Sequence, residues 1–372
     1  MQNDVPTIVE HSGAERLLGN LLEQTMPTLE PTAPAEALEL YFEDRERECQ
    51  KSTIGSHRSR LGFFVEWCAD QGIDNLNDLT ARDLHEYRIW RREDGDLSVS
   101  SEKTQMDTLR VFVEWCETID AVQPGLFTKI KSPAIPDDEA AREETLHVSR
   151  GEEIVEHLGR FEYASIEHVV WVLLTETGAR MGAIRALDVE DYRPDAEQPH
   201  LQLAHRPETD TPLKNGPRGE RRVAIPAEVC TVVDDYLAHQ RPDVTDEHGR
   251  EPLLATSQGR ASTSTIRRYV YEWSRPCVLG QGCPHDRDPD ECEAVDVDRA
   301  SSCPSSVTPH PIRRGYITYL LQAGVPVEVV SDRCDVSPKV IDRHYDVRTE
   351  EDKMRQRREV LDEVLSVSSA DR

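Results

Sequence analysis

The stretch TPHPIRRGYITYLLQAGVPVEVVSDRCDVSPKVIDRHY, residues 308–345, combines a histidine, an arginine and a tyrosine in a pattern suited to chemistry on an anion. His310 and Arg313 are three residues apart, so on a helix they share one face and can converge on one bound anion. Tyr345 follows 32 residues after Arg313. A tyrosine hydroxyl normally titrates near ~10, so it needs cations and a proton acceptor to react at neutral pH. The segment therefore predicts attack on a phosphodiester, with Tyr345 as the nucleophile.

Two upstream segments carry further basic residues in places that suit an anion. In TETGARMGAIRALDVED, residues 175–191, Gly178 ends an apolar helix (SIEHVVWVLL) and Arg180 begins the next one. An arginine at a helix start adds its forked guanidinium to an end that already favours anions. In LQLAHRPETDTPLKNGPRGERRVAI, residues 201–225, two alternating runs flank a turn with Asn215 and Gly216, which predicts a β-hairpin with Lys214 at its mouth.

In chain order, these residues resemble the catalytic set of the tyrosine recombinases, also called the phage integrase or Xer-like family. The resemblance spans about residues 37–350 and carries five residues: Arg180, Lys214, His310, Arg313 and Tyr345. Each motif alone occurs by chance in many proteins, so the order and spacing together support the resemblance. It implies a site-specific recombinase or integrase that cuts and rejoins double-stranded DNA as a homo-tetramer, without metal or ATP, through a 3′-phosphotyrosyl intermediate.

The resemblance also implies a role for each of the five residues. Tyr345 attacks the scissile phosphate, while Arg180 and Arg313 bind its non-bridging oxygens and stabilise the charge of the transition state. Lys214 protonates the departing 5′ oxygen, and His310 accepts the proton of the nucleophile as general base.

Two positions depart from the family pattern. The acidic residue expected three positions after the first arginine is Ala183, and the second histidine or tryptophan expected before the nucleophile is replaced by Cys334 or Asp335. These departures keep open a catalytically silent DNA-binding protein on the same fold. A type IB topoisomerase and a zinc-dependent nuclease built on a cysteine-rich insert are further alternatives.

Composition and periodicity predict two helical domains joined by a linker. Residues 1–34 are rich in proline and are expected to be disordered; residues 35–131 are expected to form an all-α, SAM-like core-binding domain. Its predicted helices are 35–50, 57–71, 81–93 and 99–119, with the near-duplicates LGFFVEWC (61–68) and LRVFVEWC (109–116) packed in its core. After a linker at 132–147, residues 148–350 are expected to form the catalytic domain, mainly α with a small antiparallel β-sheet. Ser149 and Glu152 predict a capping box for its first helix.

The net charge of −27 is unusual for a protein with a polyanionic partner. Only 7 of the 44 basic residues are lysines, and this acidic, arginine-rich composition resembles that of haloarchaeal proteins. At ~1 M salt the Debye length is only ~3 Å, so local contacts outweigh net charge. Solvated, ion-paired faces are the ordinary interpretation of arginine clusters, but three of them are candidate DNA contacts: Arg88, Arg91 and Arg92; Arg218, Arg221 and Arg222; Arg267 and Arg268.

Four of the nine cysteines lie in an insert at residues 277–303, CVLGQGCPHDRDPDECEAVDVDRASSC. Its low hydrophobicity predicts that something other than a core orders it. A structural zinc ion would serve, with Cys277, Cys283, Cys292 and Cys303 as ligands and His285 as an alternative ligand. The spacings of 5, 8 and 10 intervening residues match no standard finger, and disulfides or free thiols remain the rival interpretation. Four further cysteines are expected to pack as small apolar groups: Cys49, Cys68, Cys116 and Cys230.

The tail, residues 351–372, is expected to contain an amphipathic helix with Met354, Val360, Leu361 and Val364 as its apolar positions. It packs either within the chain or, as the resemblance implies, on a neighbouring protomer. No signal peptide or membrane-spanning run is found, which predicts a cytoplasmic protein with no membrane partner. Three sources of the DNA substrate stay open: a virus, a plasmid or the chromosome. Viruses and plasmids are mobile genetic elements.

Overall fold

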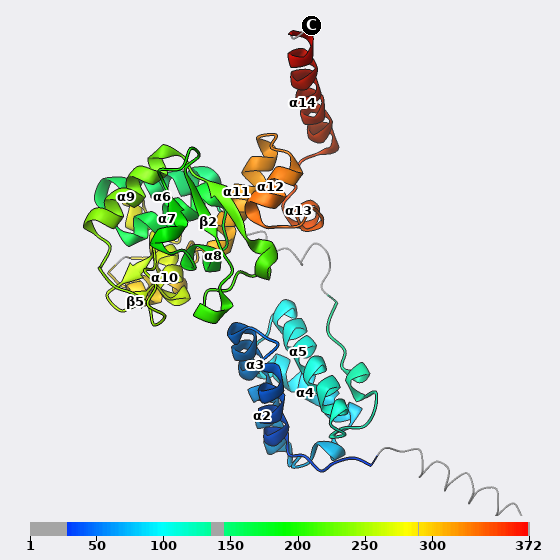
Figure 1. Ribbon diagram of the computed structural model, residues 1–372. Coiled ribbons are helices and arrows are strands. Elements are labelled where there is room, and N and C mark those ends of the chain that lie inside the picture. Colours follow the sequence, from blue (N-terminus) through cyan, green and yellow to red (C-terminus); the bar gives the residue numbers. More distant parts are fainter. Residues whose placement is uncertain (1–27, 135–144, 289, 371–372) are drawn as a thin grey trace, which may run out of the picture. The chain divides into compact units, whose positions relative to one another are not determined.

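The computed structural model describes residues 28–134, 145–288 and 290–370, and the chain divides into two compact units (Figure 1). The first unit extends to Arg142 and the second begins at Glu143, inside the linker predicted at 132–147. Most of that linker, and residues 1–27 of the predicted disordered segment, lie outside the described residues.

The first unit is helical throughout its described part. It contains α2 (Pro34–Arg45), α3 (Lys51–Gln71), α4 (Ala81–Asp94) and α5 (Val99–Thr118), with 3₁₀ turns at Leu76–Asp78 and Leu126–Lys129. Thr80 and Asp83 form a capping box at the start of α4, and Ser98 caps α5 by accepting from the backbone N–H of Ser101. The structure confirms the four predicted helices, although α2 ends five residues earlier and α3 begins six residues earlier than the patterns predicted.

The near-duplicate segments of α3 and α5 form the centre of this unit. Phe64 and Phe112 are fully buried, and their rings meet edge to face with centroids 6.2 Å apart. Cys68 and Cys116, which end the two segments, are also fully buried. The near-duplicate segments therefore belong to two core helices that face each other, as the apolar periodicity predicted.

The second unit is built around α7 (Ile166–Thr177), whose residues from His168 to Leu174 are all buried. Helices apolar on every side belong in the interior, and α7 contacts α6, α9, α10 and α11. The remaining helices are α6 (Val148–Phe161), α8 (Met181–Arg185), α9 (Ala227–His239), α10 (Thr263–Ser274), α11 (Pro309–Gln322), α12 (Val327–Cys334), α13 (Pro338–His344) and α14 (Glu350–Ala370). Short 3₁₀ turns occur at Val189–Asp191, Pro207–Thr209, Gly216–Gly219, Pro276–Leu279, Glu293–Val295 and Val297–Ser302.

The predicted capping box at the start of the second unit is wrong. Helix α6 begins two residues earlier, with His147 as its N-cap in place of Ser149, and the His147 Nδ1 accepts from the backbone N–H of Ser149. An imidazole nitrogen can accept in this way, so the cap is supplied by a residue that the capping pattern does not include.

The β-structure of the described residues is small and antiparallel. A three-stranded sheet has the order β1 (Tyr192–Arg193), β2 (His200–Leu203), β3 (Arg221–Ala224), with Leu203 paired to Arg221 next to the segment that connects β2 to β3. A separate ribbon pairs β4 (Ala255–Thr256) with β5 (Gly259–Arg260). The fold class predicted from the sequence, mainly α with a small antiparallel sheet, is confirmed.

The connection between β2 and β3, residues 204–220, is anchored by ion pairs at its base. Arg206 donates from both terminal nitrogens to the carboxylate of Asp191, at 2.8 and 2.7 Å. The neighbouring Asp188 is buried and pairs with Arg250 and Arg260. A bidentate pair fixes direction as well as position, so the connection leaves the sheet along a defined path toward α12.

Helices α11, α12 and α13 lie side by side at one end of the second unit, in orange in Figure 1. A close approach of backbone to α11 depends on Gly315, where a Cβ would lie 1.9 Å from the carbonyl oxygen of Leu146. The last residues of the predicted linker are therefore packed directly on the helix that carries His310 and Arg313.

The tail helix α14, in red in Figure 1, is tied to α11 near its start. The side-chain amide of Gln356 donates to the carbonyl oxygens of Leu321 and Gln322. Met354 is 59% and Leu361 57% exposed, so the described part of the chain does not cover these two predicted apolar positions. Among the described residues, no helix has the length and apolar character needed to span a membrane.

Candidate active site

Arg313 is the most deeply buried member of the predicted set. Only 2% of it is exposed, and its Nη1 donates to the carbonyl oxygen of Gly178 at 2.7 Å. Gly178 ends α7 in the left-handed conformation, and a Cβ there would lie 2.3 Å from the ring of Tyr316. Glycine at position 178 is thus needed both for the chain reversal and for the close packing of Tyr316.

Arg180 is the N-cap residue of α8 and comes two residues after that glycine. Its Nη1 pairs with Oδ2 of Asp335, at the end of α12. The other carboxylate oxygen of Asp335 accepts from the side-chain amide of Asn215 at 2.8 Å. One carboxylate therefore joins α8, α12 and the β2–β3 connection.

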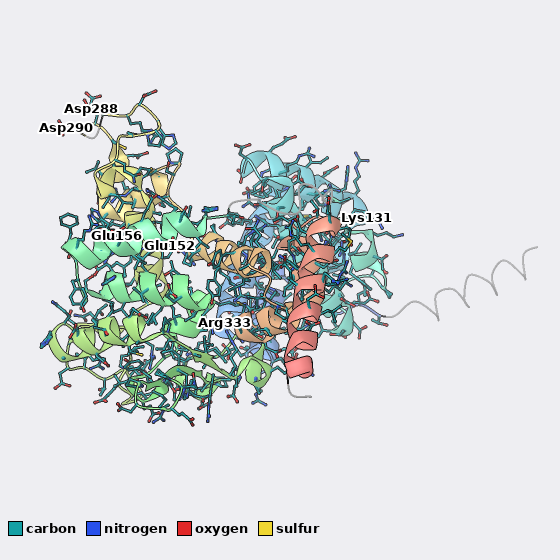
Figure 2. The ribbon with its side chains drawn as sticks, turned by 90° about the horizontal axis from the view of Figure 1, so that it is seen from above. Lys131, Glu152, Glu156, Asp288, Asp290 and Arg333 are labelled. Carbon is teal, nitrogen blue, oxygen red and sulfur yellow. The ribbon has the colours of Figure 1, made fainter. Side chains whose placement is uncertain are left out.

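Arg221, on β3, lies between the β2–β3 connection and α12. Its Nε donates to the carbonyl oxygen of Arg333, and its Nη1 to that of Gly219, each at 2.8 Å. Arg333 in turn donates to the carbonyl oxygens of Glu176 and Ala224, and Figure 2 shows it on α12. Burial lowers the pKa of Arg221 to about 10, so at neutral pH it still carries its charge.

Tyr345 lies immediately after α13, with its ring in a small core formed by α11, α12 and α13. Only 6% of it is exposed. The guanidinium of Arg314 lies 5.5 Å from the centre of the ring, and Arg314 also donates to the carbonyl oxygen of His344. Tyr345 is also near enough to Arg313 to affect the pKa of that guanidinium, which burial lowers overall. The nucleophile candidate and the buried arginine are thus neighbours.

His310, in the first turn of α11, is exposed beside the same arginines. Partial desolvation lowers the pKa of its imidazole, and the positive charges of Arg313, Arg314 and Arg180 lower it further. The neutral imidazole is therefore favoured at neutral pH. That is the form in which a histidine accepts a proton.

The site has more positive charge than its own carboxylate can balance. Arg180, Arg221 and Arg313 influence one another electrostatically, and Asp335 is the carboxylate that pairs with Arg180. Burial, and next the charge of Arg180, lowers the pKa of Arg313. Its Nη2 is buried and has no hydrogen-bond partner within the described part of the chain. A buried, unpaired guanidinium N–H requires an acceptor, and an anionic ligand supplies one.

Comparison with solved structures identifies the fold that carries this site. A lambda integrase dimer bound to a COC′ core site is 13% identical, with a TM-score of 0.58, over 90% of this chain and 82% of that chain. The Tn1549 transposon integrase, in complex with transposon right end DNA, is 14% identical, also with a TM-score of 0.58, over 89% and 100%. At these identities the likeness concerns the fold.

A third structure is related at the level of sequence. It is the N-terminal domain of a phage integrase/site-specific recombinase from Haloarcula marismortui, which is 33% identical and has a TM-score of 0.27. The match covers 28% of this chain and 99% of that domain. The chain belongs to the tyrosine recombinase, or phage integrase, family. No protein-family model and no curated protein matched it.

In this recombinase fold, four of the five predicted catalytic residues lie in one cluster: Arg180, His310, Arg313 and Tyr345. Lys214 is exposed on the β2–β3 connection, and the structure records no hydrogen bond to it among the described residues. It is next in sequence to Asn215, which contacts Asp335. Lys214 therefore stands at the edge of the cluster, on the segment that reaches toward it.

The two candidates for the position before the nucleophile have different surroundings. Cys334 is fully buried in the core of α11–α13, and burial raises the pKa of its thiol, so it is a packing group. Asp335 is in the left-handed conformation that ends α12 and points its carboxylate at Arg180. Ala183, which replaces the expected acidic residue, is buried in the main core.

The candidate DNA-contacting arginines of the first unit differ in exposure. Arg91 is buried, with its guanidinium 3.8 Å from the centre of the Phe63 ring. Arg88 pairs at 2.6 Å with the buried carboxylate of Glu102. Arg92 is the exposed member of the three. The first two are used inside the unit, which leaves Arg92 as the member open to a phosphate.

The candidates of the second unit are more open, with one exception. Arg218, Arg222, Arg267 and Arg268 are exposed, although Arg222 donates to Gln202 and Arg268 pairs with Asp298 at 3.4 Å. Arg221 is the exception, because its guanidinium donates to the backbone of α12 and is close enough to Arg180 and Arg313 to be affected by their charges.

Sequence reasoning did not assign three residues that build this site. Arg221 was assigned to a surface cluster, and neither Asn215 nor Arg314 was assigned to the active site. The strand alternation offered a signal for Arg221, since it lies two residues before the buried Val223 and so shares its face of the sheet. Asn215 and Arg314 are recognised only from contacts with residues 120 and 30 positions away.

Proposed function

We propose that this protein is a site-specific recombinase that breaks and rejoins DNA strands through a covalent bond between Tyr345 and a 3′-phosphate. The observation that carries the proposal is the buried Nη2 of Arg313, which has no acceptor among the described residues and belongs to a guanidinium near Tyr345. Support also comes from the related folds, whose structures are bound to DNA, as a dimer for lambda integrase and as a tetramer on a Holliday junction in another crystal. The working assembly proposed here is a homo-tetramer on double-stranded DNA.

In the proposed reaction, the Tyr345 oxygen attacks the phosphorus atom and the bond to the 5′ oxygen breaks. His310 accepts the tyrosine proton, and Lys214 donates a proton to the departing oxygen. Arg180 and Arg313 hold the non-bridging oxygens, where charge develops in the transition state. The energy of the phosphodiester is kept in the tyrosyl link, so a 5′ hydroxyl from another duplex can reverse the step and exchange strands.

A nicked DNA substrate tests the proposal directly. When the protein cuts next to the nick, the short fragment carrying the 5′ hydroxyl diffuses away and the protein stays attached to the labelled strand. We expect an adduct that survives denaturation and disappears after protease treatment. A protein that binds the same DNA with no adduct under any salt condition would be the catalytically silent alternative. Relaxation of supercoiled plasmid without strand exchange would instead indicate a type IB topoisomerase.

The pKa of His310 predicts the pH dependence of cleavage. Because the pKa is lowered below its usual value of 6.5, the imidazole stays neutral as the pH falls through 6.5. A general base works in its neutral form, so single-turnover cleavage is expected to hold its rate at pH 6.5 and to decline only at lower pH. In His310→Gln this acidic decline should be absent from the residual rate. A decline centred above pH 6.5 in the wild-type protein would contradict the assignment.

Asp335 is proposed to act as a positioning residue for Arg180. Its carboxylate is held by Asn215 on one oxygen and pairs with Arg180 on the other. A hydrogen bond to a charged group contributes about 1.5–3 kcal/mol, so Asp335→Ala should slow cleavage by about ten- to a hundredfold. Since the carboxylate acts through Arg180, the loss in the double variant with Arg180→Ala should be smaller than the sum of the two single losses.

The matched control for this experiment is Asp332→Ala, which removes an exposed carboxylate from the same turn of α12. Its cleavage rate should equal that of the wild type. If Asp335→Ala instead cleaved faster and bound DNA more tightly, the carboxylate would be a competitor of the phosphate, and the positioning role would be excluded.

A further inference from the structure

The cysteine-rich insert between α10 and α11 lacks a hydrophobic core of its own. Among its described residues from 277 to 303, only Ala294 and Ala300 are buried. Figure 2 shows Asp288 and Asp290 at the outer end of the insert, which projects from the rest of the second unit. Two buried alanines remove too little apolar surface from water to order a segment of this length. Another interaction must hold the insert together.

The four cysteines of the insert face a common interior. Cys277, Cys283, Cys292 and Cys303 are each partly buried, while most of their neighbours are exposed. All four line one small cavity of about 20 Å³. That volume holds about one water-sized sphere, which is the scale of a single metal ion. The chain brings thiols together from positions 26 residues apart in sequence around a space of that size.

The charges around the cavity fit a negatively charged centre. Arg275 lines the cavity and is 3% exposed, yet it donates only to the carbonyl oxygens of Glu272 and Ala294 and has no carboxylate partner among the described residues. Arg287 lines the cavity as well. A buried guanidinium without an anion is costly. A divalent ion held by four thiolates has a net charge of −2, which these two arginines would balance.

We propose that Cys277, Cys283, Cys292 and Cys303 bind one structural zinc ion. Cysteine thiolates in a set of four are a common zinc-binding set, with Zn–S bonds of about 2.3 Å. No three described His, Cys, Asp or Glu side chains stand close enough together to hold a metal ion as they are placed here. The ion would therefore draw the thiols inward across the cavity, as metal binding coupled to folding requires.

The histidine of the insert is not a ligand in this proposal. His285 also lines the cavity, but it is exposed, and its Nε2 is hydrogen-bonded to the Ser305 hydroxyl at 2.7 Å. Four cysteines already complete a tetrahedral structural site. His285 therefore links the insert to Ser305, just beyond it, and leaves the metal to the thiolates.

Zinc at this place would fix the start of the helix that carries His310 and Arg313. Cys277 comes just after α10, and Cys303 lies six residues before α11. An ion that binds both closes the insert into a loop and removes conformational freedom from the segment between the helices. The backbone N–H of Val307 donates to the Ser274 hydroxyl at 3.0 Å, which also joins the end of α10 to the segment before α11. The site is independent of the recombination chemistry proposed above.

The test measures metal and does not depend on DNA cleavage. The full chain is purified under reducing conditions from cells grown in zinc-supplemented medium. Its metal content is then determined by elemental mass spectrometry. We expect about one zinc ion per chain, and a loss of most of it in Cys292→Ser. His285→Ala should retain the ion. Cys49→Ser is the matched control, because Cys49 is also partly buried but lies in the first unit.

A second measurement on the wild-type chain covers the case in which Cys292→Ser does not fold. The four insert thiols should resist a thiol reagent until a chelator removes the ion, and the melting temperature should fall on chelation and recover with added Zn²⁺. The proposal is overturned if the chain neither contains nor takes up zinc, or if Cys292→Ser binds as much as the wild type. A disulfide between any two of these cysteines in the reduced preparation would also overturn it.

Discussion

Tyr345→Phe should abolish the covalent adduct with nicked DNA while leaving DNA binding intact. The substitution removes one oxygen atom and keeps the ring, which is 94% buried among α11, α12 and α13. With the hydroxyl absent, no bond to phosphorus can form, and the adduct should fall to the background of the assay. Gel-shift affinity should change by no more than a few-fold, since the ring and the arginines around it remain.

Tyr319→Phe is the matched control for this prediction. Tyr319 lies on α11 and is 49% exposed, so it loses the same atom from the same unit without touching the arginine cluster. Its adduct yield should equal that of the wild type. An adduct of unchanged yield in Tyr345→Phe would show that another residue is the nucleophile, and peptide mapping of the labelled strand would name it.

The buried position of Tyr345 also predicts that the segment around it moves when DNA binds. A tyrosine that is only 6% exposed cannot reach a phosphate without some movement of α13. Arg314 and Thr318, both on α11, hold the backbone next to the nucleophile through the carbonyl oxygens of His344 and Tyr345. Proteolysis at the α13–α14 junction should therefore become faster when cognate DNA is bound, if the segment is released for attack.

Arg313→Lys should lower the cleavage rate by about two to three powers of ten, as the loss of one donor to developing charge does in other enzymes. The wild-type guanidinium donates from Nη1 to the carbonyl oxygen of Gly178 and has Nη2 left for the phosphate. A lysine has one nitrogen and cannot occupy both positions. The positive charge is kept, so a loss of this size would show that cleavage depends on the positions of the two guanidinium nitrogens.

Two controls separate a catalytic loss from misfolding in this variant. The melting temperature shows whether the buried lysine is tolerated, and Arg160→Lys makes the same exchange in an exposed ion pair with Glu156. The control should cleave at the wild-type rate. If Arg313→Lys keeps its fold and cleaves normally, the buried arginine is a structural residue and the proposed clamp is wrong.

Local sequence patterns were sufficient for much of the fold. The apolar repeats of α3 and α5, the caps at Thr80 and Ser98, and the break at Gly178 each depend on a few neighbouring residues. Such signals act within one or two turns and can be recognised in a single chain. The start of α6 was misplaced because its cap is a histidine, a residue that the common capping pattern omits.

The sequence by itself determined which chemical groups the site contains and the order in which they occur, from Arg180 through Lys214 and His310 to Tyr345. Only the tertiary structure decided how they are used. It buried Cys334 and turned Asp335 toward Arg180, 155 residues away, and it brought Arg221 into the site while Arg91 was buried in another unit. The physical reason is that burial and ion pairing are set by which surfaces meet, and contacts between distant segments leave no periodic signal in the chain.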